Sequence, residues 1–545
     1  MTNKEIGELF GELASLMELH GDNEFKIRAY SSAYLTIKKL DIPLLEKSKE
    51  ELSKLTVISK AVAEKIVELS STGKIEALEE LRHKTPEGIR AMFKIKGVGP
   101  KKVKVFWKEM NLESIGELHY ACKENRLILY KGFGPKIQED IIKNIEYLQS
   151  NEGSFLYAKL KLISDELLLE LKSINPKLTI QETGELRRCM PILQKIEFLV
   201  DNSTVTFSEK FSIESETTTT IKGKFLDNFP FEFTICNPKE FHTQLLISTG
   251  GSDAFKKFIH IDKVKDIHSE EEYFNSAKLP YIPAECRDID DYNDFDNNKL
   301  VIDSDILGVI HNHSTYSDGM YDIQTMAQEC IRLGYKYLVI SDHSKTAAYA
   351  NGLPIERVEM QWREIDELNK KLHPFKIYKS IESDILSDGS LDYPEDILKG
   401  FDLVIASIHS NLNMDEEKAM MRLMNAIENP YTKVLGHLTG RLLLSRRGYP
   451  VNHKKIIDAC SANNVSIEIN ANPVRLDMDY TWVPYAMKKE VMISINPDAH
   501  NLKGIQDIKY GVIAARKGGL TRDYCLNTLS QEDFNGWLKG SLSRK

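Results

Sequence analysis

The C-terminal half of the chain contains nine side chains whose types and positions suit a metal centre. Six are histidines and three are carboxylates: His311, His313, Asp318, His343, Glu382, His409, His437, Asp498 and His500. Imidazole together with carboxylate, without thiolate, favours Zn²⁺, Mn²⁺ or Fe²⁺ over Ca²⁺. Nine ligands exceed the needs of one ion, so the set predicts two or three ions with Glu382 as the bridge. Clustered divalent ions lower the pKa of a bridging water and supply hydroxide near neutral pH.

The elements that would position these side chains are short apolar segments rich in β-branched residues. They occupy 306–311, 337–341, 376–382, 403–409, 433–437, 465–470 and 491–496. Because helical segments alternate with them, the pattern predicts a parallel βα barrel, in which the carboxyl ends of the strands form the rim of the active site. A single histidine after a strand is more often a half-buried structural residue. Six of the chain's 14 histidines at equivalent strand ends favour a metal centre instead.

This C-terminal region resembles the PHP (polymerase and histidinol phosphatase) domain. The resemblance rests on His-x-His, a Ser-Asp-Gly loop, "SDHS", "IESDI", "SIHS", "GHLTGR" and "DAH". It implies a distorted seven-stranded barrel with a trinuclear metal centre that hydrolyses phosphoesters. Arg441 and Arg475 then resemble arginines that face the substrate phosphate, a role suited to bidentate guanidinium groups. Asp342 is predicted either to orient a ligand histidine or to cap a helix.

Two segments in the N-terminal region repeat Gly-x-Gly-Pro-Lys between an apolar and an amphipathic stretch. They are "FKIKGVGPKKVKVFW" (93–107) and "LYKGFGPKIQEDIIKNI" (129–145), which resemble helix-hairpin-helix motifs. Backbone N–H groups at the second helix can bind a DNA phosphate, and neighbouring lysines add attraction. The predicted DNA-binding residues are Gly97, Gly99, Lys101, Lys102, Gly132, Gly134 and Lys136. An ordinary helix-turn-helix connection is the alternative, but two copies, one inside a basic stretch, favour DNA binding.

Segments 23–37 and 55–81 resemble the small N-terminal domain of DNA polymerase beta and its relatives. In that family, the lysine matching Lys65 can form a Schiff base with an abasic sugar. The alternative for Lys65 is a solvated lysine on a helix face.

Residues 155–265 resemble the palm of family X polymerases through "TGELRRC" and "NPKEFHTQLLISTGG". The aspartates that hold two Mg²⁺ ions in that family fall on Lys195, Glu197 and Glu232. A lysine removes a ligand and adds positive charge where Mg²⁺ must bind, whereas two-metal catalysis needs carboxylates that bridge both ions. The palm is therefore predicted to be degenerate and without nucleotide transfer. The degenerate site comprises Arg187, Arg188, Lys195, Glu197 and Glu232, with the two arginines as candidates for phosphate contact.

The length of 545 residues exceeds what one core can serve, and the sequence predicts a multidomain chain. The predicted parts are an all-α N-terminal domain (1–85), a helix-hairpin-helix region (86–150), an α+β palm- and thumb-like region (151–285), an exposed acidic linker (286–304) and the (βα)7 PHP barrel (305–545). The seven scattered cysteines predict a reducing cytoplasm. No signal peptide or membrane segment is predicted.

In this order, the parts resemble the bacterial family X DNA polymerases that carry a C-terminal PHP domain and act in DNA repair. The predicted function is a monomeric, metal-dependent phosphoesterase that acts as a 3′→5′ exonuclease or endonuclease on gapped, nicked or abasic duplex DNA. Two alternatives remain open. One is an active gap-filling polymerase that uses Glu197 and Glu232, and the other is a small-molecule phosphatase of the histidinol-phosphatase type.

Overall fold

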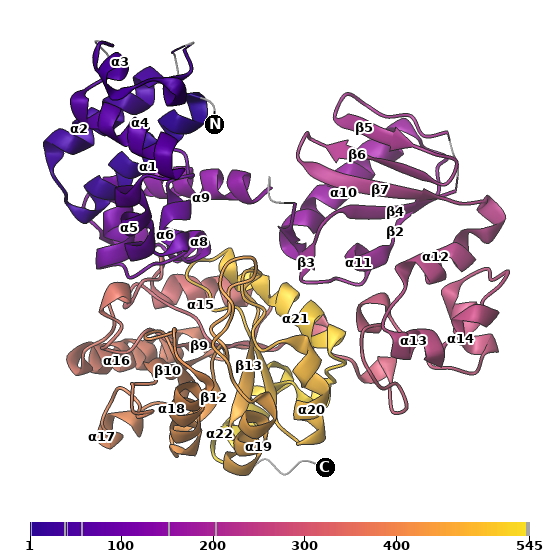
Figure 1. Cartoon of the computed structure of the whole chain (residues 1–545). Helices are drawn as coiled ribbons and strands as arrows, with labels where there is room; N and C mark the ends of the chain where they lie inside the picture. Colours follow the sequence, from indigo (N-terminus) through magenta and orange to yellow (C-terminus); the bar gives the residue numbers. More distant parts are fainter. Residues whose placement is uncertain are drawn as a thin grey trace. The chain divides into compact units, whose positions relative to one another are not determined.

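Figure 1 shows the computed structural model of the chain, which describes residues 1, 3–37, 40, 42–55, 58–150, 153–201 and 204–540. The chain divides into two compact units, residues 1–123 with 130–148 and residues 124–129 with 149–545. The first unit is helical. All strands of the described residues belong to the second unit, where they form sheets of two, five and seven strands.

The first unit is built from short amphipathic helices. They are α1 (Asn3–His20), α2 (Glu24–Ile37), α3 (Lys49–Ser53), α4 (Lys60–Thr72), α5 (Glu76–Lys84), α6 (Glu87–Met92), α7 (Pro100–Lys104), α8 (Ile115–Lys123) and α9 (Pro135–Ser150). Ile6, Phe10 and Leu13 of α1 recur every three or four residues and are fully buried, as expected for the core face of a helix. That face packs against α2, α5 and α7.

The two predicted glycine turns precede α7 and α9. Gly97 and Gly132 adopt φ values of +81° and +94°, a region that glycine enters without steric cost. Proline then begins each following helix, where its missing N–H costs nothing. A Cβ added at any of the four turn glycines, Gly97, Gly99, Gly132 and Gly134, would meet no atom within 4 Å. Both turns are therefore open to an approaching ligand.

The middle of the chain forms the five-stranded sheet, in the order β2-β4-β7-β6-β5. Its strands are β2 (Ile180–Glu182), β4 (Ile196–Val200), β5 (Phe211–Glu216), β6 (Thr220–Phe225) and β7 (Phe229–Ile235). Strands β4 and β7 run parallel, with Glu197 directly opposite Glu232. Their alternate residues, such as Phe198 and Phe233, are fully buried on the opposite face. The predicted α+β region is thus a mixed sheet that holds both glutamates side by side.

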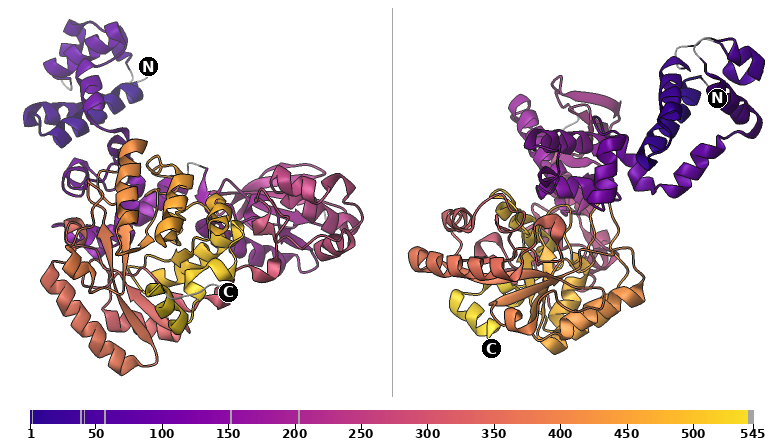
Figure 2. Two further views of the ribbon diagram at one scale, coloured as in Figure 1. Left: turned by 90° about the horizontal axis from the view of Figure 1, so that it is seen from below. Right: turned by 90° about the vertical axis from the view of Figure 1, so that its left-hand side faces the viewer.

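The C-terminal strands form one parallel sheet in sequence order: β8 (Gly308–Val309), β9 (Tyr337–Ile340), β10 (Lys376–Asp384), β11 (Leu403–Ser407), β12 (Thr432–Leu435), β13 (Ser466–Asn470) and β14 (Ile493–Asn496). A parallel bridge between Asn312 and Ala499 joins the two ends of this sheet, so the barrel is nearly closed. Helices including α15 (Ile323–Arg332), α16 (Ile355–Leu372), α18 (Glu416–Glu428) and α19 (His453–Asn463) lie outside the strands (Figures 1 and 2). The predicted (βα)7 architecture is confirmed.

The segment 286–304 is not the exposed linker that its acidic composition predicted. Arg287 is fully buried, and Tyr292 and Leu300 are only 3% and 2% exposed. Tyr292 packs against Phe255 and Phe258 at ring-centroid distances of 6.0 and 5.1 Å. The apolar residues between the acidic ones belong to a small hydrophobic core. The many acidic residues of the segment led to the prediction of an exposed linker.

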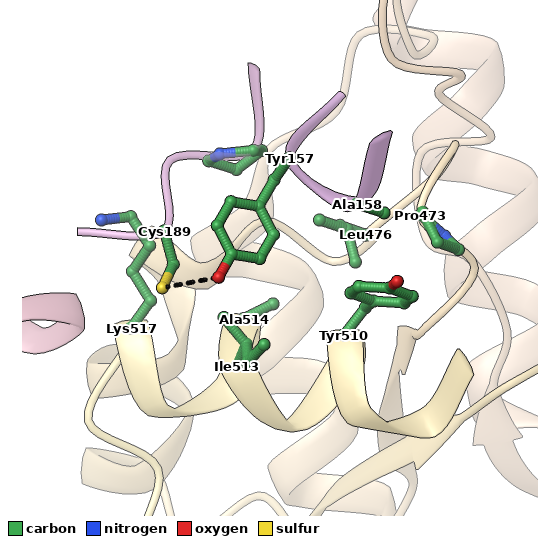
Figure 3. Close-up of a pocket in the computed structure, with 10 residues that line it drawn as sticks. Tyr157, Ala158, Cys189, Pro473, Leu476, Tyr510, Ile513, Ala514 and Lys517 are labelled. Carbon is green, nitrogen blue, oxygen red and sulfur yellow. Dashed lines mark hydrogen bonds between the residues drawn. The ribbon is translucent and has the colours of Figure 1, made fainter. Parts of the chain in front are cut away.

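Helix α21 (Ile508–Lys517) lies between the barrel and the palm-like region (Figure 3). Val512 and Ala515 belong to the core of the barrel, whereas Ile513 packs against the core of the palm-like region. The fully buried Lys517 Nζ donates to the Arg188 carbonyl oxygen at 3.1 Å and to the Asp288 carboxylate. The cavity in Figure 3 measures only about 10 Å³, room for no more than one water molecule. The contact is therefore structural and not a ligand pocket.

Within the described part of the chain, no helix combines the length and the apolarity needed to cross a membrane. All seven cysteines carry free thiols.

Candidate functional site

Glu382, at the carboxyl end of β10, occupies the centre of the predicted metal centre. Its Oε1 lies 2.9 Å from His437 Nε2, 3.0 Å from His409 Nε2 and 3.3 Å from His311 Nε2. Its Oε2 lies 3.0 Å from His343 Nδ1 and 3.7 Å from His313 Nε2. One carboxylate thus faces five imidazoles, which follow the four strands β8, β9, β11 and β12. This is the arrangement expected of a bridging ligand.

The other predicted ligands complete the cluster beside Glu382. Asp318 Oδ1 lies 3.3 Å from His500 Nε2, and Asp498 Oδ1 lies 3.0 Å from His313 Nε2. Among the described residues, ligand atoms lie within 4.8 Å of one another in four groups: His313–Asp318–His343–His500, His311–His313–Glu382, His343–Glu382–His409 and Glu124–Asp498–His500, of which Glu124 was not predicted. All nine predicted side chains therefore converge on one site.

The unsatisfied polar atoms of this cluster fit divalent cations. His311 Nε2, Asp318 Oδ2, both ring nitrogens of His343, Glu382 Oε2 and His500 Nε2 are buried without a hydrogen-bond partner. Buried polar atoms normally have partners, and an unpaired buried charge is costly. Divalent ions at this place would satisfy these atoms together, and the nitrogen and oxygen donors suit zinc, manganese or iron.

The charges of the cluster are strongly coupled. Burial, the largest influence, lowers the pKa of His409, but Glu382 and Asp384 outweigh it and raise that pKa to about 10. His500 behaves similarly: burial is outweighed by Asp318 and Glu124, and its pKa is about 10. Burial raises the pKa of Glu382, but the surrounding histidines hold it well below its usual range. The negative charges of the carboxylates are thus offset by protonated imidazoles at the place where cations would bind.

Two buried carboxylates that the sequence did not single out support the ligand histidines. Asp384 lies 2.5 Å from Nδ1 of His409, and Glu468 lies 2.6 Å from Nδ1 of His311. A metal-binding histidine commonly donates its second ring N–H to such a group. The only sequence signal was a charged residue inside an apolar strand, as in "VSIEIN".

Asp342 makes its hydrogen bonds mainly to the loop that follows β8. It accepts hydrogen bonds from Ser314 N (2.8 Å), Ser314 Oγ (2.6 Å), Ser317 N (3.1 Å), Ser317 Oγ (2.5 Å) and Gln361 Nε2 (2.6 Å). It begins no helix in the described chain. Its hydrogen bonds therefore fix the loop that leads to Asp318. The Ser317 hydroxyl also lies 3.5 Å from His313 Nδ1, so Asp342 reaches a ligand histidine only through Ser317, and its orienting role stays a prediction.

The two predicted phosphate-facing arginines differ in their surroundings. Arg441 donates to the Arg475 carbonyl oxygen at 3.0 Å, to Asp479 Oδ2 at 2.6 Å and to the Leu476 carbonyl oxygen. Each of its guanidinium nitrogens is thus engaged by the 475–479 loop, so the structure gives Arg441 a supporting role. Arg475 is 4% exposed. Burial is the largest cause that lowers the pKa of His437, and the positive charge of Arg475 is the second. Arg475 therefore lies close to the metal ligands.

Comparison with known proteins agrees with this geometry. A PHP domain model matches residues 310–472. A helix-hairpin-helix domain model matches residues 1–75, and a SAM-like helix-hairpin-helix tandem model matches residues 89–146. The barrel with its metal cluster and the helical unit with its glycine turns are therefore both known types of domain.

One relative matches along almost the whole chain. The DNA polymerase/3′-5′ exonuclease PolX of Bacillus subtilis (strain 168) is 32% identical over 571 aligned residues, covering 99% of this chain and all of that protein. The chain belongs to the PolX family. A probable phosphatase of Thermoanaerobacter sp. (strain X514) is 28% identical over 241 residues, which cover 42% of this PolX chain and 91% of the phosphatase.

The hairpin residues of this PolX chain lie on the open turns described above. Lys101 and Lys136 are exposed. Lys102 Nζ donates to the Gly97 carbonyl oxygen at 2.8 Å, so this lysine also closes the first turn. In the first helical segment, Lys65 Nζ forms an ion pair of 2.6 Å with Glu68. That pairing is typical of a structural lysine on a helix face, the alternative to a Schiff-base lysine.

The palm of this PolX chain has an ion pair where the family resemblance places metal ions. Lys195 Nζ lies 2.6 Å from Glu232 Oε2 and 3.3 Å from Glu197 Oε1. Glu197 Oε2 also accepts a hydrogen bond from Glu185 N at 2.9 Å. Both glutamates are thereby engaged within the protein.

The palm arginines are likewise paired with carboxylates. Arg187 makes bidentate contacts of 2.7 and 2.8 Å with the buried Glu270, which is also paired with the buried Arg287 at 2.8 Å. Arg188 lies 3.2 Å from Asp288. Contact with a phosphate would require both arginines to leave these partners.

Glu270→Gln is expected to lower the free energy of unfolding by about 3–5 kcal/mol, the usual cost of removing one partner from a buried ion pair. Burial raises the pKa of Glu270, but Arg187 and Arg287 together lower it from 4.5 to about 2. Because the folded pKa is depressed, the stabilisation is fully present above about pH 4.5 and is lost as the pH falls toward 2. The difference in melting temperature between wild type and Glu270→Gln should shrink over that range. The exposed neighbour Glu271→Gln is the control, and a pH-independent difference would contradict this account.

Proposed function

We propose that this chain is a metal-dependent phosphoesterase that cleaves DNA at ends or abasic sites, and that its palm performs no synthesis. The observation that carries the proposal is the convergence of nine candidate metal ligands, eight buried and His409 partly buried, in the barrel of a chain that also has helix-hairpin-helix domains. In this proposal residues 1–85 and 86–150 bind DNA, 305–545 hydrolyse it, and 151–285 serve as structural support. The gapped, nicked or abasic duplex is the substrate.

The mechanism assigns a task to each part of the site. When bound, two or three zinc, manganese or iron ions would supply an activated water and stabilise negative charge on the phosphate. Glu382 and the histidines around it hold the ions. Asp342 fixes the loop of Asp318, and Arg475 is placed to bind a phosphate oxygen through its guanidinium group. The free, scattered thiols support a reducing cytoplasm as the compartment. The working form in this proposal is a monomer.

A single reaction distinguishes this function from its alternatives. The substrate is a gapped duplex whose primer carries a 5′ label, incubated with Mn²⁺ in the presence and absence of dNTPs. Shortening under both conditions is expected. Template-dependent extension would identify an active gap-filling polymerase. An unchanged primer, combined with hydrolysis of p-nitrophenyl phosphate, would identify a small-molecule phosphatase.

Replacing Lys101 and Lys136 together by alanine is expected to weaken DNA binding to a similar extent for all sequences. The loss of one or two phosphate contacts should also flatten the slope of log affinity against log salt by about one or two units. Lys399→Ala is the matched control, because that side chain is 60% exposed and pairs with Glu395 in the barrel. Unchanged affinity and slope in the double variant would place the DNA-binding face elsewhere.

A further inference from the structure

Strand β13 belongs to the barrel (Figure 1). Glu468 is the middle one of its five residues, and its side chain is fully buried. Its neighbours Ile467 and Ile469 belong to the apolar core. Because side chains alternate along a strand, Glu468 and Asn470 point together to the opposite side, toward the metal cluster. A carboxylate at this depth is costly unless it is fully paired, so its partners indicate what it does.

Four donors surround the Glu468 carboxylate. Oε2 lies 2.6 Å from His311 Nδ1 and accepts from Asn496 Nδ2 at 2.8 Å. Oε1 accepts from the His437 backbone N–H at 3.1 Å and from Asn470 Nδ2 at 2.9 Å. An ionised carboxylate only accepts hydrogen bonds, so the ring proton of neutral His311 must reside on Nδ1. The lone pair of His311 Nε2 is then directed at Glu382 and Asp498, 3.3 and 3.6 Å away.

The contacts of Glu468 also reach two other predicted ligands. His437 is held through its backbone, and Asn470 Nδ2 donates a second hydrogen bond to Asp498 Oδ2 at 3.0 Å. One buried group therefore ties together ligands that follow β8, β12 and β14. Asp384 is its counterpart on the opposite side, since it lies 2.5 Å from His409 Nδ1.

We propose that Glu468 is a positioning residue of the metal centre, which fixes His311 as the Nδ1–H tautomer and thereby builds the ion position formed by His311, His313 and Glu382. This inference rests on the proposed metal-dependent function. Asp384 acts in the same way on the position formed by His343, Glu382 and His409. The two carboxylates consequently support different ions of one cluster.

Glu468→Gln tests the inference with little change in volume. A carboxamide cannot accept hydrogen bonds on both of its polar atoms, so either His311 or the pair His437 and Asn470 loses its acceptor. The full-length variant, loaded with Mn²⁺ and dialysed, is expected to retain one ion fewer than wild type, or to bind that ion tenfold to a hundredfold more weakly. Glu468→Asp should recover part of the affinity.

The tautomer of His311 supplies a readout that does not depend on catalysis. In ¹⁵N-histidine spectra of the wild type loaded with diamagnetic Zn²⁺, assigned with a His311→Gln variant, His311 should carry its proton on Nδ1. Glu468→Gln should change this signal, whereas Asp384→Asn should lose a different ion and leave the His311 signal unchanged. Full metal affinity with an unchanged signal in Glu468→Gln would overturn the inference.

The outcomes separate the inference from the proposed function. If Glu468→Gln fails to fold, the spectrum of the wild type still tests the inference. A proton on Nε2 of His311 would contradict it, and a proton on Nδ1 would support it. If wild type binds metal but leaves DNA intact, the proposed function fails, while the metal counts and the tautomer still test Glu468. If wild type binds no divalent metal, both are wrong.

Discussion

Glu382→Gln is expected to remove metal-dependent DNA cleavage and to lower the number of bound ions, while DNA affinity stays nearly unchanged. Glu382 faces five imidazoles, and a carboxamide can offer only one oxygen to the ions that those imidazoles would share. The rate should fall by at least about a hundredfold, the loss that follows removal of even the outer partners of metal ligands. Cleavage of the labelled gapped duplex and metal content after dialysis measure the two effects.

His343→Ala should act in the same direction, because His343 belongs to two of the ligand groups. The matched control is Glu359→Gln on α16, an exposed glutamate that pairs with Arg363. It should leave metal content and rate unchanged. Cleavage by Glu382→Gln at the wild-type rate would show that the phosphoesterase activity resides outside the barrel.

No template-dependent nucleotide incorporation is expected from the wild-type chain with either Mg²⁺ or Mn²⁺. Lys195 places its ammonium group 2.6 Å from Glu232 and 3.3 Å from Glu197, in the space that two metal ions would need. Each glutamate also carries one methylene more than aspartate, and misplacement of a catalytic group by about 1 Å can cost on the order of a hundredfold. Primer extension on gapped DNA measures the outcome directly.

The complementary variant restores aspartate at all three positions: Lys195→Asp, Glu197→Asp and Glu232→Asp. It is expected to bind Mg²⁺ in the palm and to recover measurable synthesis, once Arg187 and Arg188 are released from Glu270 and Asp288. Lys222→Asp is the control, since it changes a neighbouring charge 3.5 Å from Glu232 without supplying a family ligand. Extension by wild type that is lost in Glu232→Gln would mean that the palm is a working site.

The metal centre could be predicted because its signal is local. Every predicted ligand except Asp318, which lies in the loop after the first segment, stands at or just after the end of an apolar segment. The strands follow one another in the sheet in sequence order, so ligands on neighbouring segments become neighbours in space. Glu468 and Asp384 could not be found in this way, because their roles depend on which imidazole faces them across the barrel. The hydrogen bonds of Arg441 to the Arg475 and Leu476 carbonyl oxygens and to Asp479 could not be found from the sequence for the same reason, and its contact with phosphate stays a prediction.

The sequence predicted the chemistry of single palm residues better than the burial of the segment that follows the palm. The ion pair of Lys195 with Glu232 follows from their chemistry once both occupy former metal positions. The burial of Tyr292 and Leu300 could not be predicted from the composition of the segment. A few apolar residues are enough to pack it against the rest of the protein, even though most of its residues are polar or acidic.

Helix α21 packs against the barrel on one side and against the palm on the other, which has a consequence for the role of the palm. Val512 and Ala515 face the barrel and Ile513 faces the palm, while Lys517 is paired with Asp288 beneath both. Deleting the palm would uncover the apolar face of α21 around Ile513 and remove the Arg188 carbonyl oxygen from Lys517 Nζ, at a cost to the solubility of the barrel. In the proposed function, this packing gives the palm a structural role that does not depend on nucleotide transfer.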